Sequence, residues 1–276
     1  MRDLSNDTSL LAINSATVKA WSLEQLAEGC ARAGIKAIAP WRDIVQAAGV
    51  DKAGRLIRRH GLTVTCLCRG GMFPAADAAG RRAALDDNRR AVDEAAGIGA
   101  RCLVLIAGGL PEGSKDLPSA HAQVEEGLAA LLPYARGANV PLAIEPLHPM
   151  YCADRACVNT LAHANDLCDR LGEGLGIALD VYHVWWDPDL PRQIARAGKR
   201  ILTYHVCDWL VPTKDLLLDR GMPGDGVIDL RRIRAMVEAA GYTGHCDVEI
   251  FSTQNWWKRD PDEVLRICRE RHQTVV

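Results

Sequence analysis

The sequence lacks the features of a membrane-spanning, secreted or nucleic-acid-binding protein. No apolar run reaches the roughly 18 residues of a membrane-spanning helix, and the polar start, Met1–Thr8, contains no apolar signal segment. The 33 Lys and Arg nearly balance the 35 Asp and Glu, so no general attraction for nucleic acid or anionic lipid is expected. We therefore predict a cytoplasmic protein with neither nucleic-acid nor membrane partners.

Cysteine is plentiful, with ten residues in 276, but no pair has the C-x-x-C spacing typical of a zinc knuckle. Five lie in or beside apolar, strand-like segments, namely Cys66, Cys68, Cys102, Cys207 and Cys246. We interpret these as small, reduced core residues, because free cysteine is among the most buried residue types.

Apolar segments rich in Val, Ile and Leu alternate with longer segments of helical periodicity. The eight expected strands are 10–14, 35–39, 62–67, 102–106, 142–145, 176–180, 201–206 and 246–250. Strict alternation is typical of parallel strands joined by crossover helices, and eight such units in this length predict an α/β fold, a single (β/α)₈ TIM barrel over residues 1–276. A doubly wound sheet normally has a glycine-rich turn after its first strand, and residues 14–19 contain no glycine.

Four consecutive expected strands carry an ionisable residue at or near their carboxyl ends, namely Glu145, Asp180, His205 and Glu249. In a barrel these ends share the face where catalytic groups gather. Any one of them could instead be a helix cap or half of an ion pair. Three clustered carboxylates repel each other unless a cation is present. The set therefore predicts a divalent metal site, best suited to Mn²⁺, with Mg²⁺, Co²⁺ and Zn²⁺ as alternatives.

These residues resemble the xylose isomerase-like TIM-barrel superfamily, which includes ketose 3-epimerases, hydroxypyruvate isomerase, inosose dehydratase and endonuclease IV relatives. The likeness rests on Glu145 in Ile-Glu-Pro-Leu, Asp180-Val-Tyr-His183, His205-Val-Cys-Asp208, Pro223-Gly-Asp-Gly226 and Asp-Val-Glu249. The resemblance implies that Glu145, Asp180, His205 and Glu249 bind the metal. It further implies that Glu145 and Glu249 form the acid/base pair, and that His183 and Arg220 contact substrate oxygens.

A cation at the strand ends can chelate a sugar's carbonyl and adjacent hydroxyl oxygens and stabilise the enediolate that forms when the C–H between them is deprotonated. Two glutamates can remove and return that proton. We therefore expect a divalent-metal-dependent isomerase or epimerase that acts on a keto-sugar. If a leaving group lies beside the carbanion, the enzyme is instead a lyase on a keto-sugar or 3-keto-glycoside.

The lyase alternative resembles inosose dehydratase or the catalytic subunit of C-glycoside deglycosidases, which pairs with a small partner subunit. A homo-oligomer is expected otherwise. DNA repair is disfavoured, because endonuclease IV relatives use further His ligands from earlier strands, and segments 66–69 and 105–108 contain none. A non-catalytic sugar-binding or scaffold protein is also disfavoured, since the ligand set is intact.

Tryptophan is unusually frequent, at seven residues against two Phe, and every Trp follows a strand end. Such indoles stack on sugar or aglycone rings or build subunit interfaces, and both interpretations stay open here. Under the first, Trp41 and Trp185 are expected to contact substrate. His148, three residues after Glu145, is a further candidate catalytic group.

Overall fold

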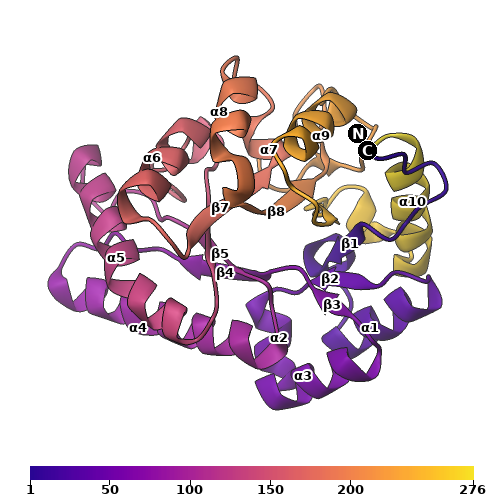
Figure 1. Ribbon diagram of the computed structural model, residues 1–276, viewed down its shortest axis with the longest axis horizontal. Coiled ribbons are helices and arrows are strands. Elements are labelled where there is room, and N and C mark those ends of the chain that lie inside the picture. Colours follow the sequence, from indigo (N-terminus) through magenta and orange to yellow (C-terminus); the bar gives the residue numbers. More distant parts are fainter.

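A computed structural model, which describes residues 1–276, contains nine parallel strands that form a nearly closed barrel (Figure 1). The strands are β1 (Leu11–Asn14), β2 (Ala37–Ala39), β3 (Thr63–Val64), β4 (Leu67–Gly71), β5 (Leu103–Ile106), β6 (Leu142–Glu145), β7 (Leu175–Asp180), β8 (Ile201–Val206) and β11 (Cys246–Val248). Their order around the sheet is β3-β2-β1-β11-β8-β7-β6-β5-β4. The predicted TIM-barrel architecture is confirmed.

The ninth strand arises because the third expected strand divides in two. β3 pairs with β2, and β4 pairs with β5. Hydrogen bonds to the segment that contains β2 continue across the break between β3 and β4. The N–H groups of Thr65 and Cys68 donate to the carbonyls of Ile38 and Pro40, each at 3.0 Å. The expected end of this strand at residue 67 is wrong, because β4 continues to Gly71.

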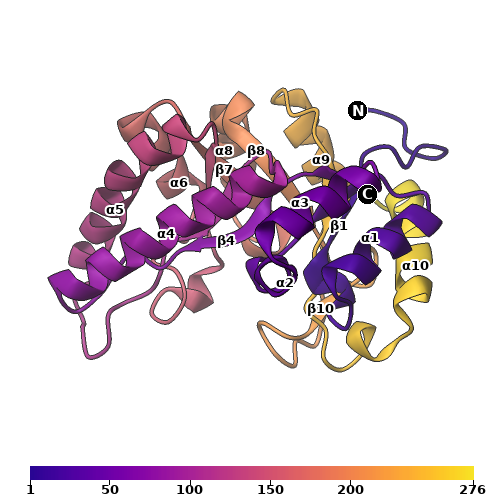
Figure 2. The same cartoon turned by 90° about the horizontal axis from the view of Figure 1, so that it is seen from below.

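Helices surround the strands on the outside, and α3 and α4 run next to each other there (Figures 1 and 2). They are α1 (Leu23–Arg32), α2 (Arg42–Ala48), α3 (Val50–Arg59), α4 (Ala78–Ile98), α5 (Leu117–Gly137), α6 (Leu161–Leu171), α7 (Val181–Val184), α8 (Leu190–Ala197), α9 (Leu230–Ala239) and α10 (Pro261–Thr274). The helix α10 begins with Asp260 as its N-cap and Pro261 in its first turn, an arrangement that satisfies free backbone N–H groups. No helix is both long and apolar enough to span a bilayer.

The apolar core has two parts. A cluster of 68 buried residues fills the space between strands and helices. A cluster of seven, inside the barrel, consists mainly of small residues, namely Ala39, Cys66, Cys68, Cys102, Val104, Ala143 and Ala178. All ten cysteines are free and nine are buried, which confirms their interpretation as reduced core residues. The small interior side chains leave room for larger polar groups at the carboxyl ends of the strands.

Gly71 is the residue at which the β4–β5 packing is most sensitive to substitution. Its φ is +106°, and a Cβ there would lie 1.9 Å from the carbonyl oxygen of Ile106. We expect Gly71→Ala to lower the free energy of unfolding by about 2–4 kcal/mol, from backbone strain and steric overlap. Urea denaturation measures the change. Gly137→Ala is the control, because Gly137 is helical with no atom within 4 Å of a Cβ, and should lose no stability. Equal losses in the two variants would contradict this account.

Candidate active site

Four adjacent strands place the four predicted metal ligands at one end of the barrel. Glu145 ends β6, Asp180 ends β7, His205 lies in β8, and Glu249 directly follows β11. Asp180 and His205 are paired in the β7–β8 register, so their side chains lie side by side. All four side chains are buried, and each offers a ligand atom within 4.8 Å of the others. The structure thus brings together the set that the sequence predicts, while its role as a metal site remains a prediction.

The imidazole of His205 faces the carboxylates. Its Nδ1 lies 3.6 Å from Oε2 of Glu249 and 3.9 Å from Oε1 of Glu145, and it has no hydrogen-bond partner. Burial opposes the charged form, but Glu249 and the thiol of Cys66 outweigh it and raise the pKa of His205 well above its usual range. In the metal-free protein the imidazole therefore holds a proton that partly neutralises the carboxylates.

The two glutamates differ in their pKa values. Burial, reinforced by the charge of Glu249, raises the pKa of Glu145 to about 8. Burial also acts on Glu249, but His205 and Arg220 outweigh it and lower the pKa of Glu249 below its usual value. Two nearby carboxyls whose pKa values are shifted in opposite directions are typical of acid/base sites.

These four residues fit a divalent cation. Carboxylate oxygens and an imidazole nitrogen are suitable donors for Mn²⁺, Mg²⁺ or Zn²⁺. The buried, unpartnered Nδ1 of His205, directed at two carboxylates, is the arrangement expected of a ligand atom. The other nitrogen, Nε2, lies 3.6 Å from Sγ of Cys66, a contact that can orient the ring.

A further buried carboxylate, Asp247, lies below the four residues and was not predicted from the sequence. Asp247 accepts hydrogen bonds from the hydroxyls of Thr65 at 3.0 Å and Thr203 at 2.8 Å, and its Oδ2 is 3.9 Å from Nε2 of His205. Burial raises its pKa to about 7. The two-residue alternation of a strand was the available signal, because it places Asp247 on the same face as Glu249.

Arg220, predicted to contact substrate, is brought into the site by a small hairpin of β9 (Asp208–Trp209) and β10 (Arg220–Gly221). Its Nη1 lies 2.9 Å from Oδ2 of Asp180 and 3.4 Å from Oε2 of Glu249, and its guanidinium is 4.3 Å from the ring centre of Tyr182. His183 Nε2 lies 3.2 Å from Nη2 of the same arginine. Burial lowers the pKa of His183 to about 3, so its imidazole is neutral at physiological pH.

The two predicted substrate-contacting tryptophans differ in position. Trp41 lines the cavity above the four residues and donates from Nε1 to Oε1 of Glu249 at 3.3 Å. Trp185 lies outside the cavity lining, with its ring 5.8 Å from that of Trp209. Only Trp41 is therefore placed to meet a ligand in this cavity.

His148, the third predicted catalytic group, also has its side chain outside the cavity lining. Its ring packs against Trp186 and Trp209, with centres 5.6 Å and 5.0 Å away. Its backbone N–H donates to Nδ1 of His183 at 3.2 Å. In this structure His148 positions His183 through its backbone, and a catalytic role for its imidazole stays untested.

The cavity also contains side chains that do not lie at the ends of predicted strands and were not predicted from the sequence. Its lining comprises Trp41, Cys68, Arg69, Val104, Ile106, Glu145, Leu147, Tyr151, Arg155, His183, Leu217, Arg220, Glu249 and Phe251. The free volume among them is about 20 Å³, room for about one water molecule. A sugar can enter only if flexible side chains at the rim move.

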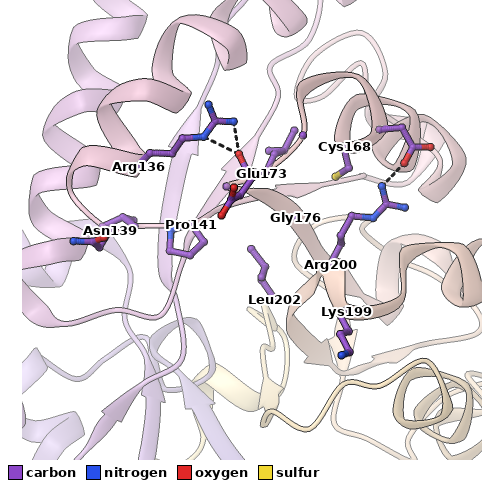
Figure 3. A pocket seen from close by; sticks show the side chains of 14 residues that line it. Arg136, Asn139, Pro141, Cys168, Glu173, Gly176, Lys199, Arg200 and Leu202 are labelled. Atoms are coloured by element: carbon purple, nitrogen blue, oxygen red, sulfur yellow. Dashed lines mark hydrogen bonds and ion pairs between the residues drawn. The ribbon is translucent and has the colours of Figure 1, made fainter.

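A larger, more open hollow lies at the opposite end of the barrel, beside the amino ends of β6, β7 and β8 (Figure 3). Arg136 there donates to the carbonyl of Glu173 at 2.8 Å, and Arg200 pairs with Asp169. Both arginine side chains are therefore already bound to other groups of the protein. Active sites of TIM barrels also lie at the other end of the barrel. The candidate site is therefore the smaller cavity over the four ligands.

Comparison with known proteins agrees with this architecture. Residues 27–270 match the family model of the xylose isomerase-like TIM barrel. The chain belongs to this family. Inosose isomerase of Bacillus velezensis is 27% identical over 159 residues, which cover 55% of this chain and 54% of that protein, so the chain spans about half the length of this curated relative.

Solved structures extend the similarity over the whole barrel. A protein from Sinorhizobium meliloti 1021 is 62% identical, with a TM-score of 0.96 over 98% of this chain and 99% of that one. The IOLI protein, solved with a zinc atom, is 20% identical, with a TM-score of 0.83 over 95% of both chains. At that identity the likeness shows a shared fold.

Metal binding by the four residues should release protons. At pH 7 the metal-free protein holds a proton on most Glu145 carboxyls, whose pKa is about 8, and on His205, whose pKa is raised. A cation needs both groups deprotonated, so affinity for Mn²⁺ should rise as the pH rises through the Glu145 pKa of about 8. Calorimetric titration with Mn²⁺ in buffers of different ionisation enthalpy measures the protons released.

The matched variants are Glu145→Gln in the site and Glu126→Gln on the exposed surface of α5. We expect the first to weaken Mn²⁺ binding by about tenfold or more, on the scale of losing one charged partner, and the second to leave it unchanged. Binding that involves no proton release, or that survives Glu145→Gln, would contradict the assignment.

Proposed function

We propose that the protein is a divalent-metal-dependent isomerase or epimerase of a keto-sugar. The observation that carries this proposal is the convergence of Glu145 and Glu249, two buried carboxyls with opposite pKa shifts, on one cavity beside Asp180 and His205. The similarity to inosose isomerase supports a cyclic or open-chain keto-sugar as the substrate class. Mn²⁺ is the proposed cation, with Mg²⁺, Co²⁺ and Zn²⁺ as alternatives.

When bound by the four residues, the cation would polarise the carbonyl and so acidify the neighbouring C–H. The protein then has to move one proton. Glu145 and Glu249 lie on β6 and after β11, with β7 and β8 between them in the sheet, so they approach a bound sugar from two sides. One glutamate, as the carboxylate, removes the proton from carbon and keeps it, while the other, as the carboxylic acid, delivers its own proton to carbon. The pair thereby exchanges protonation states, and the roles are reversed for the opposite direction of reaction.

His183 and Arg220 provide hydrogen-bond donors. Nδ1 of His183 accepts the backbone N–H of His148, so the hydrogen of the neutral ring is assigned to Nε2. Nε2 lies at the cavity beside Nη2 of Arg220. Donors at this position can hold sugar hydroxyl and carbonyl oxygens and stabilise negative charge as the proton leaves.

Deuterium exchange tests the acid/base pair. The metal-loaded enzyme is incubated in D₂O with inososes, ketohexoses and 3-keto-glucosides, and incorporation at carbon is followed by NMR. We expect Glu145→Gln and Glu249→Gln each to slow exchange on an accepted substrate by about 10²–10⁴-fold, the usual effect of a general acid or base. Glu126→Gln should exchange normally. Unchanged exchange in either site variant would remove this role.

The same assay separates the isomerase from the lyase alternative. A lyase passes through the same carbanion but releases water or an aglycone, whereas an isomerase or epimerase exchanges hydrogen without loss of a fragment. Prior chelation should stop either reaction. Release of a fragment would replace our proposal with a lyase on a keto-sugar or 3-keto-glycoside.

A further inference from the structure

Two arginines in the cavity have no partner of opposite charge. Arg69 lies in β4 and Arg155 follows the short helical turn at 149–151. Both are half-buried, and both line the cavity with Glu145 and Glu249. Neither side chain forms an ion pair within 4.0 Å, and the Nε of each is buried without a hydrogen-bond partner. Five guanidinium donors on each side chain are thus available to a ligand.

Three arginines whose side chains have little solvent exposure show how this chain normally treats such groups. Arg42 pairs with Glu94 at 2.5 Å, Arg220 with Asp180 at 2.9 Å and Arg234 with Glu238 at 3.1 Å. A charge taken out of water without a partner costs free energy. Arg69 and Arg155 are exceptions, and both lie in the same cavity.

The charge balance of the cavity makes these exceptions informative. A divalent cation and Arg220 would offset the three carboxylates Glu145, Asp180 and Glu249. Asp247 below them, with its pKa raised to about 7, adds at most one further negative charge, so positive charge from Arg69 and Arg155 is still left over in the cavity. Burial and the neighbouring Arg155 both lower the pKa of Arg69, and the charge of Glu145 opposes them only in part. The two cations therefore act on each other. A bound anion would remove this repulsion and satisfy the free donors.

We propose that Arg69 and Arg155 bind an anionic group of the substrate, a carboxylate or a phosphoryl group, so that the enzyme acts on an acidic keto-sugar. Guanidinium groups match both anions in planar, two-point hydrogen bonding. This inference rests on the proposed function and specifies its substrate class. Because neither arginine is held by an ion pair, both side chains can move aside as the sugar enters the narrow cavity.

Binding of simple probes tests the proposal without requiring turnover. D-Gluconate, D-fructose 6-phosphate and neutral D-fructose are titrated calorimetrically into the metal-free and the Mn²⁺-loaded protein. At least one acidic probe should bind about tenfold or more tightly than D-fructose, and it should do so without metal as well, which excludes simple chelation. A preference for gluconate or for the phosphate ester identifies the anion.

Arg69→Gln and Arg155→Gln should each weaken binding of that acidic probe about tenfold, the scale of a lost charged hydrogen bond. Arg→Lys at the same positions should restore part of it, because the charge is kept. Arg82→Gln, at an exposed position on α4, is the control. Circular dichroism and Mn²⁺ content should match the wild type in all variants. Failure of both acidic probes to bind, or binding that survives both Gln substitutions, overturns the proposal.

The two proposals can fail separately. If neutral keto-sugars exchange hydrogen normally and the arginine variants are indifferent to acidic probes, the isomerase function stands and the anion site is wrong. If acidic probes bind through the arginines but no keto-sugar exchanges hydrogen, the anion site stands and the isomerase function is wrong.

Discussion

Three buried carboxylates have oxygen atoms within 4.8 Å of one another. The repulsion between them is the constraint on which this site depends. Glu145, Asp180 and Glu249 are almost inaccessible to water, and charges so close cannot all stay ionised without compensation. In the metal-free protein the compensation is visible in several places. Glu145 tends to hold a proton, His205 is charged, and Arg220 lies against Asp180. A divalent cation bound by the three carboxylates would replace the protons on Glu145 and His205 as the compensating positive charge.

The barrel explains how so costly a cluster can form. Parallel strands bring their carboxyl ends to one face, and the backbone hydrogen bonds of the sheet hold those ends in place. The small side chains of Ala143 and Ala178 line the interior below the charged layer and leave room for the larger polar groups above them. Asp247, held by the hydroxyls of Thr65 and Thr203, lies behind His205. The four candidate ligands are therefore supported from below by Asp247, which is itself hydrogen-bonded.

Much of this arrangement could be predicted from the sequence, because it follows from strand periodicity. The strands 142–145 and 201–206 were predicted with the bounds the structure has, and the residues at their ends converge as expected. The third strand was harder, since a two-residue break in pairing at 65–66 leaves no signal in its apolar composition. Convergence of strand ends is a property of the fold, whereas breaks in pairing depend on local backbone geometry.

Side chains that follow the strands were less predictable, because loop conformation decides where they point. Trp41 and Trp185 both follow strands, yet only Trp41 lines the cavity. Arg155 comes from a loop with no periodicity to reveal it. Arg69 lies in β4 beyond residue 67, the predicted end of that strand, so the pattern of residues at strand ends does not identify it.

The proposed cation site and the unpaired arginines would together fix the orientation of a substrate in the cavity. Glu145 and Glu249 belong to the candidate metal-ligand set, and Arg69 and Arg155 line the same small cavity. A substrate whose carbonyl contacts the cation and whose anionic group contacts the arginines would be held at two points, which would fix the carbon between them relative to both glutamates. Neutral sugars would be held at the cation alone and could turn. Selectivity would then come from the spacing between carbonyl and anion, and the cost of burying two unpaired guanidiniums would be recovered only when the right substrate binds.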